Sequence, residues 1–252
     1  MTRAPDIVEL SAVALTGAYN VALNRHLPQM THLPANLAAS GVLVLLARRA
    51  GVGLDGLGLA PETAARGACT GLTVAAGAAG VVVMGAAFPP TRRFFVDERV
   101  RDHTTAELTY HTLLRIPVAT ALGEELVFRA ALLGLFGRGR SRAVAVAATS
   151  VLFGLWHILP TLESLGPGPT TSPAADGPTS RWHARAGRAA LVTGVVVATA
   201  GAGAAFAALR LRSKSVLAPV VAHAGLNVAT LIAARVVSRG TPAPPLDRCR
   251  PA

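Results

Sequence analysis

The chain has 252 residues, of which 52% are hydrophobic and only 15% are charged, and its mean hydropathy is +0.48. This composition excludes an ordinary water-soluble globule and predicts an integral membrane protein. The formal net charge of +11 comes almost entirely from arginine, because Lys214 is the only lysine. Such charge normally lies in loops that face anionic lipid. A nucleic-acid partner would need basic residues gathered on one soluble face with aromatic residues between them, and the sequence predicts no such face, so this partner is not expected.

Apolar runs close to the length of a bilayer crossing recur along the chain and predict an all-α, polytopic transmembrane helix bundle. We expect about seven spans, within a range of six to eight, in a multi-pass protein of the cell membrane, with a polar cavity inside the bundle. In chain order the expected spans are 7–23, 33–47, 67–88, 106–136, 141–159, 187–209 and 216–237.

The same pattern divides the chain into N-terminal helices and connectors (1–105), a core (106–237) and a disordered tail (238–252). Closely spaced glycines in 67–88 are typical of helices that approach each other in lipid. Pro117 is expected to kink the long fourth span. The stretch 161–179 is rich in Pro, Gly, Ser and Thr and predicts a flexible loop.

The two cysteines, Cys69 and Cys249, lie far apart in the sequence and in different settings. A disulfide framework or a cysteine-based zinc site is therefore not expected.

Two adjacent glutamates lie in the middle of the apolar run 106–136. Ionisable groups inside a lipid-buried helix are costly and are by default functional, with a partner expected nearby. Glu125 and Arg129 are four residues apart, so they share a helix face and are expected to pair. Glu124 points about 100° away from Glu125 around the helix axis. Arg129 therefore cannot pair with both carboxylates, and one glutamate, Glu124, is left free for chemistry. The alternative is a structural ion pair beside a solvated neighbour at a helix end.

Two later spans bring further polar groups. Phe153 and His157 share one helix face, and so do His223 and Asn227, because each pair is four residues apart. Polar groups on three helices of an apolar bundle should turn inward, toward one another. A carboxylate and an imidazole can activate water, while a second imidazole and an amide donate hydrogen bonds to an oxyanion. Trp156 is interpreted as an anchor at the membrane interface.

Three of these residues, Glu124, His157 and His223, are also candidate metal ligands, and zinc would lower the pKa of a bound water. The sequence contains no H-E-x-x-H motif, and the three candidates are expected on different helices. The sequence alone therefore does not establish a cofactor. We favour hydrolysis without a metal and leave zinc-dependent hydrolysis as an open alternative.

The ordered set Glu124-Glu125-x-x-Phe128-Arg129, Phe153-x-x-x-His157 and His223-x-x-x-Asn227 resembles the CPBP family. That family takes in CAAX prenyl endopeptidases, which remove the last three residues of prenylated proteins, and bacterial Abi-type bacteriocin-processing and immunity proteins. The resemblance spans about residues 108–234, half of the chain. One departure is Ala130, where a glycine often follows the arginine.

The resemblance implies a helical intramembrane protease fold, with 106–237 as the protease core. It implies an endopeptidase that acts on a membrane-associated substrate, of the prenylated CAAX type or carrying a leader. By position, it implies that Glu124 activates water with His157 and that His223 and Asn227 stabilise the oxyanion. Three further residues would then support this geometry: Glu125, Arg129 and Phe153.

Two other classes of function stay open. A non-catalytic membrane scaffold or a bacteriocin-immunity protein would hold the same polar groups for a partner, and its function would survive Glu124→Gln. A transporter would use Glu124 and His157 as a proton relay, although the sequence lacks paired broken helices in two matching halves. The expected partners are the lipid bilayer and a membrane-associated peptide or protein substrate.

Overall fold

The computed structural model describes residues 6–166 and 178–241, and every regular element in these ranges is a helix. Six of the helical stretches are long and apolar enough to cross a membrane. They are Ile7–Arg25, Gln29–Arg49, Pro61–Ala87, Arg142–Ser164, Ala186–Ser213 and Leu217–Arg239. The predicted all-α, polytopic membrane bundle is therefore confirmed, and the number of candidate spans lies within the expected range.

The N-terminal part contains three long helices and several short ones. In chain order these are α1 (Ile7–Arg25), η1 (Gln29–Thr31), α2 (His32–Arg49), α3 (Leu54–Leu57), η2 (Pro61–Thr63), α4 (Ala64–Ala87), α5 (Pro89–Arg92), η3 (Arg93–Phe95) and α6 (Glu98–Arg101). α4 ends at Ala87, and α5 begins at Pro89, where the missing N–H of proline would have no helical partner in any case.

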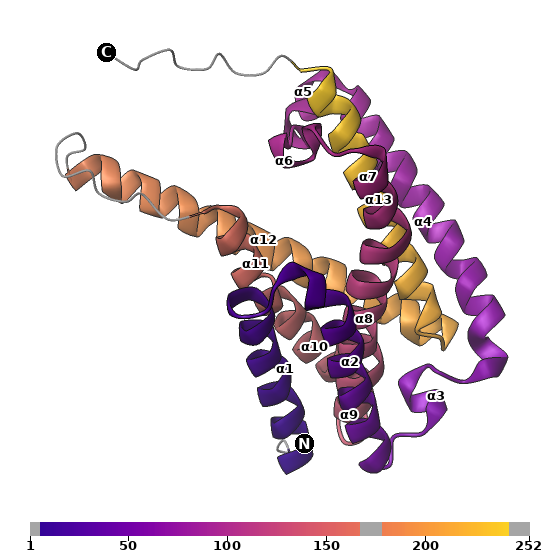
Figure 1. The fold of residues 1–252 in the computed structure, drawn as a ribbon. Coiled ribbons are helices and arrows are strands. Elements are labelled where there is room, and N and C mark those ends of the chain that lie inside the picture. Colours follow the sequence, from indigo (N-terminus) through magenta and orange to yellow (C-terminus); the bar gives the residue numbers. More distant parts are fainter. Residues whose placement is uncertain (1–5, 167–177, 242–252) are drawn as a thin grey trace, which may run out of the picture.

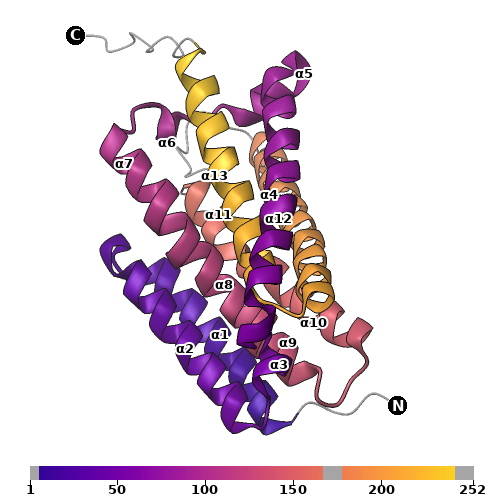
Figure 2. The ribbon, with the colours of Figure 1, turned by 90° about the vertical axis from the view of Figure 1, so that its right-hand side faces the viewer.

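The predicted span 106–136 is an unbroken helical run through the middle of the bundle (Figure 2). Its consecutive parts are α7 (Thr105–Tyr110), η4 (His111–Leu122), α8 (Gly123–Glu125), η5 (Leu126–Leu132) and α9 (Leu133–Phe136). η4 and η5 are π-helical. Pro117 lies inside η4, where its ring removes one backbone donor and disturbs the regular hydrogen-bond ladder. All residues from 127 to 136 are buried.

Four further helices complete the bundle: α10 (Arg142–Trp156), α11 (Ile158–Ser164), α12 (Pro178–Ser213) and α13 (Leu217–Arg239). α13 lies along α4 over most of its length, and α12 crosses α10 (Figure 1). α13 also packs against η4, so the central helical run lies between the α4–α13 pair and α2 (Figure 2).

The predicted flexible loop 161–179 is wrong at both ends, because residues 161–164 belong to α11 and residues 178–179 belong to α12. Pro160 lies in the first turn of this helix, where proline is tolerated, and the Thr161 hydroxyl donates to the carbonyl of His157 at 2.6 Å. Residues 167–177 of the predicted loop lie outside the described residues. At the C-terminal end of the chain, α13 continues to Arg239. Residues 242–252 of the predicted tail lie outside the described residues.

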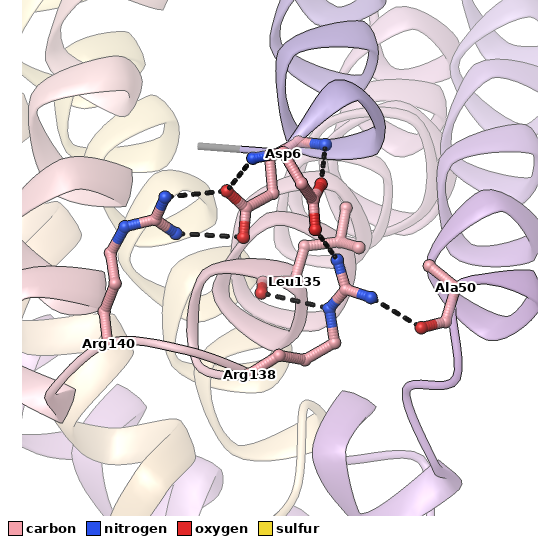
Figure 3. A network of polar contacts seen from close by, with 6 residues as sticks. Asp6, Ala50, Leu135, Arg138 and Arg140 are labelled. Carbon is pink, nitrogen blue, oxygen red and sulfur yellow. Dashed lines mark hydrogen bonds and ion pairs between the residues drawn. The ribbon is translucent and has the colours of Figure 1, made fainter. Parts of the chain in front are cut away.

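Two ion pairs fasten the start of α1 to the turn between α9 and α10 (Figure 3). Arg140 donates to both carboxylate oxygens of Glu9, at 2.9 and 2.7 Å, and Arg138 donates to Asp6 at 2.9 Å. A second guanidinium nitrogen of Arg138 donates to the carbonyl of Ala50 at 2.6 Å. Bidentate arginine–carboxylate pairs fix the relative position of the two side chains well. This network therefore holds the start of α1 and the end of α2 against the C-terminal end of the central helical run.

Glycines allow two pairs of helices to come into backbone contact. A Cβ added at Gly71 of α4 would lie 2.6 Å from the carbonyl oxygen of Ala218 on α13. One added at Gly154 of α10 would lie 2.6 Å from the carbonyl oxygen of Val196 on α12. By contrast, a Cβ at Gly77 of α4 would meet nothing within 4 Å. The close approach expected from the glycines of 67–88 is thus present at the start of α4.

Replacing Gly71 by alanine should destabilise the fold, whereas the same change at Gly77 should not. The new methyl at 71 collides with the α13 backbone, and such overpacking costs about 1–3 kcal/mol. Gly77→Ala gains helix propensity, worth up to about 1 kcal/mol, without a clash. The free energy of unfolding of both variants in detergent micelles measures the difference. Equal stabilities would show that α4 and α13 do not touch as described.

Candidate active site

Three helices bring the predicted polar residues to the middle of the bundle. α8 carries Glu124 and Glu125, His157 forms the junction between α10 and α11, and α13 carries His223. Asn227 follows His223 by one turn on α13. The junction at His157 exists because α10 ends there, before a separate helix begins at Ile158.

Glu125 is the centre of a fully buried polar cluster. Its Oε1 accepts a hydrogen bond from Arg129 Nη1 at 3.2 Å and another from His223 Nδ1 at 2.9 Å. The pairing expected from the four-residue spacing of Glu125 and Arg129 is therefore present. The three residues are 0%, 1% and 6% exposed, so the carboxylate has both donors at a depth where an unpaired charge would be very costly.

Aromatic rings enclose this cluster. The Arg129 guanidinium lies over the ring of Phe153, 4.0 Å from its centroid, and 5.5 Å from the centroid of Phe206. The His223 ring stacks on Phe206, with centroids 5.1 Å apart and an interplanar angle of 23°. Cation–π contacts of this kind stabilise a desolvated guanidinium. Phe153, expected as a supporting residue, thus contacts Arg129 directly.

Glu124 has a different environment from Glu125. Its Oε1 accepts a hydrogen bond from the indole nitrogen of Trp156 at 3.3 Å. Its Oε2 is buried and, like Oε2 of Glu125, receives no hydrogen bond from any residue that the structure describes. Buried oxygens without a donor are rare and call for an explanation. Glu124 therefore has one oriented oxygen and one oxygen able to accept a proton or a hydrogen bond from another molecule.

Trp156 is only 6% exposed and contacts Glu124, so its interpretation as an interfacial anchor is wrong. Its backbone carbonyl accepts a hydrogen bond from the Asn20 side chain of α1 at 3.1 Å, and its ring lies 6.0 Å from that of Tyr19. α1 therefore supports the residue that orients Glu124. In the sequence, only the position of Trp156 next to His157 indicated that it could belong to the site. No motif indicated a role for Asn20.

His157 is held in one tautomer by its own helix. Its Nδ1 lies 2.8 Å from the carbonyl oxygen of Phe153. Because a carbonyl only accepts, Nδ1 carries a proton, so Nε2 is the nitrogen that can offer a lone pair. The ring also packs edge-on against Phe153, with centroids 4.7 Å apart. The expected four-residue pairing of Phe153 and His157 therefore sets the position of the imidazole and places a proton on its Nδ1.

The side chain of Asn227 is half-buried and makes no hydrogen bond to another described residue. Phe206, which stacks on His223, was missed by the sequence reasoning. It lies on α12, in a run rich in Ala and Gly without any recognisable motif. Its role depends on which face of α12 meets α13, and the sequence does not show this.

The candidate zinc ligands do not gather into a metal site. Within residues 6–166 and 178–241, no three His, Cys, Asp or Glu side chains come close enough together to hold an ion. Oε1 of Glu125 is also already engaged by Arg129 and His223. The donor set in this arrangement does not fit a three-ligand zinc centre.

Residues 106–229 match the family model described as type II CAAX prenyl endopeptidase Rce1-like. The segment belongs to the Rce1-like family. It covers about half of the chain and contains Glu124, His157, His223 and Asn227 together with their supporting residues. No curated protein and no solved structure matches the chain. The Rce1-like match and the six apolar helices together make this an integral, multi-pass membrane protein of an intramembrane CAAX-type endopeptidase family.

The buried cluster of the Rce1-like segment leads to a prediction about stability. Arg129→Met leaves the Glu125 carboxylate buried without its guanidinium partner, and breaking such a pair typically costs about 3–5 kcal/mol. The double variant Glu125→Gln/Arg129→Met leaves no charge behind and should recover part of this loss. The measurement is the free energy of unfolding in detergent.

The control for this prediction is Arg99→Met, which removes an arginine from an exposed pair with Asp97. Exposed pairs contribute little, so this variant should stay within about 1 kcal/mol of the parent. A double variant less stable than the single Arg129→Met would contradict the description of Glu125 and Arg129 as a compensated pair.

Proposed function

We propose that this protein is an intramembrane endopeptidase of the cell membrane that hydrolyses a peptide bond in a membrane-associated, CAAX-type substrate, with water activated by Glu124. One observation carries the proposal: the Glu125 carboxylate is engaged by a cation and an imidazole, whereas the Glu124 carboxylate accepts a hydrogen bond from the neutral indole of Trp156 alone among the described residues. The Rce1-like match favours the CAAX-type substrate over a leader-bearing one.

In the proposed first step, water donates a hydrogen bond to the free oxygen of Glu124 and another to Nε2 of His157. Its oxygen attacks the scissile carbonyl carbon while Glu124 takes the proton. Hydrogen bonds from Trp156 to Glu124 and from His157 to Phe153 support this step, because they orient both groups before the substrate arrives.

In the second step, the tetrahedral oxyanion accepts hydrogen bonds from His223 and from the Asn227 amide. The contact of His223 Nδ1 with Glu125 supports this role. Because Nδ1 is used by Glu125, a doubly protonated His223 ring has its Nε2–H left to donate to the oxyanion. The C–N bond breaks as Glu124 returns its proton to the leaving amine. No step is assigned to a metal, since the candidate ligands are not gathered.

Glu124→Ala and His157→Ala should each abolish cleavage while leaving a folded, membrane-inserted protein. Loss of a general acid–base group typically lowers the rate about 10²- to 10⁴-fold. The assay uses purified protein with prenylated and unprenylated peptides, each with and without chelator. Glu62→Ala is the matched control, because Glu62 is exposed in η2, outside the Rce1-like segment, and its activity should equal that of the parent.

Full proteolysis by Glu124→Ala or His157→Ala would overturn the assignment of these residues. Loss of activity on adding chelator, with recovery on adding zinc, would replace the metal-free mechanism by a zinc-dependent one.

A further inference from the structure

A pocket of about 360 Å³ lies between the segment that follows α2, the end of α9, the start of α10 and the last turn of α12. We call it the arginine pocket, because Arg138, Arg142 and Arg210 line it together with five glycines and four apolar residues. No Asp or Glu belongs to the described residues that line it. By contrast, a polar pocket beside η4 has charges of both signs, because Asp97 and Glu107 line it as well as arginines. The arginine pocket is therefore a site of positive charge, and the proposed hydrolysis uses none of its residues.

The three arginines of this pocket differ in their partners. Arg138 donates to the carboxylate of Asp6 and to the carbonyl of Ala50, so its charge is already matched (Figure 3). Arg142 is exposed, and its side chain makes no hydrogen bond or ion pair to a described residue. Arg210 has partners, but all of them are neutral. Two of the three positive charges are therefore unmatched within the described part of the chain.

Arg210 is a buried cation, with only 6% of its surface exposed. Its Nη2 donates to the backbone carbonyl of Asp55 at 3.2 Å and to that of Gly56. Its Nε is buried without an acceptor among the described residues, and its Nη1 makes no hydrogen bond to them either. The two carbonyls hold the guanidinium in place without neutralising it. Because a buried charge without a counter-charge is costly, an anion is expected beside Arg210.

The start of α10 adds further positive charge to the pocket. Arg142 is the first residue of this 15-residue helix, and Ala145 in the same first turn also lines the pocket. The backbone N–H groups of a first helical turn carry a partial positive charge and readily bind phosphate groups. An anion in the arginine pocket would therefore meet two unmatched guanidinium groups and the start of a long helix.

Both unmatched arginines lie at the ends of candidate membrane spans. Arg142 is the first residue of the span Arg142–Ser164, and Arg210 lies three residues before the end of the span Ala186–Ser213. Three residues are about 4.5 Å along a helix. The headgroup layer of a bilayer lies just outside its hydrocarbon core, and basic pockets between membrane helices are typical sites for anionic headgroups. The arginine pocket is therefore at the depth of the lipid phosphates.

We propose that the arginine pocket binds a phosphate group, which accepts hydrogen bonds from Arg210 and Arg142. Guanidinium groups suit this ligand, because charge-assisted hydrogen bonds to phosphate are strong and arginine is weakly hydrated. Two sources have the same chemistry, the headgroup of an anionic phospholipid and a soluble phosphate ester, and the depth of the pocket favours the phospholipid. The inference goes beyond the proposed hydrolysis and does not depend on it.

The test follows thermal unfolding of the purified full-length protein in neutral detergent micelles that contain rising fractions of phosphatidylglycerol. A ligand that binds the folded state raises the unfolding temperature with its concentration, so the titration gives an apparent affinity. Salt at about 0.3 M limits the attraction between exposed charges to less than about 10 Å. Phosphatidylglycerol should stabilise the parent protein. Phosphatidylcholine should stabilise it less, because its choline offsets the phosphate charge.

Arg142→Gln and Arg210→Gln should each lower the apparent affinity for phosphatidylglycerol about tenfold, since each removes hydrogen bonds from a charged donor. Without lipid, Arg142→Gln should unfold as the parent does, because its side chain has no described partner. If Arg210→Gln does not fold, Arg142→Gln decides the question. The matched control is Arg212→Gln, which makes the same change of charge at an exposed residue of α12 outside the pocket. Its affinity should stay within about twofold of that of the parent.

A second titration, with glycerol 3-phosphate and no added lipid, distinguishes the two sources. Stabilisation by phosphatidylglycerol alone supports a lipid headgroup, and stabilisation by glycerol 3-phosphate that Arg142→Gln weakens supports a soluble phosphate ester. If neither compound stabilises the parent, the inference is wrong. Equal stabilisation by phosphatidylglycerol and phosphatidylcholine would also overturn it, because the anionic charge would then not matter. Equal losses in Arg142→Gln and Arg212→Gln would show that the basic surface attracts the lipid and that the pocket does not bind it.

Discussion

The interaction on which the centre of this protein depends is the buried contact of Glu125 with Arg129 and His223. A carboxylate this deep in an apolar bundle would be very costly alone. Here one oxygen receives both donors, and the guanidinium is covered by aromatic rings from α10 and α12. The contact joins the central helical run to α13, so the position of His223 is set by the same group that neutralises Arg129.

Once Glu125 is committed in this way, its neighbour has a different environment. Glu124 lies on the adjacent face of the helix, where its one donor among the described residues is the neutral indole of Trp156. Oε2 of each glutamate is buried without a donor among those residues. Such an arrangement is unfavourable for stability, because a buried acceptor lacks a partner. Proteins keep costs of this kind chiefly at functional sites. The proposed water-activating role gives Glu124 a reason to bear that cost.

The sequence predicted those features that depend on spacing within one helix. The Glu125–Arg129 contact and the shared face of Phe153 and His157 follow directly from the helical repeat. Contacts between helices could not be predicted in the same way. The hydrogen bond from Trp156 to Glu124 depends on how α10 faces α8, which packing across the bundle decides.

The end of the predicted fifth span shows the same limit. In the sequence, Pro160 is a typical helix-stop signal. In the structure, α10 instead ends before His157, and the next helix, α11, begins directly after it. A proline is compatible with a first helical turn as well as with a helix end, and local sequence does not choose between the two. The pocket beside η4 could likewise not be predicted from the sequence, since its lining residues come from a charged connector, from η4 and from α13, far apart in the sequence.

The division of roles between the two glutamates is tested most directly by the thermal stability of Glu124→Gln and Glu125→Gln, measured side by side with peptide cleavage. Both variants should be inactive. Glu124→Gln should unfold at or above the temperature of the parent, because the Trp156 indole can still donate to the amide oxygen and no ion pair is lost. Glu125→Gln should unfold at a lower temperature, because it leaves Arg129 without its carboxylate. Equal losses of stability, or cleavage by Glu124→Gln, would contradict the account.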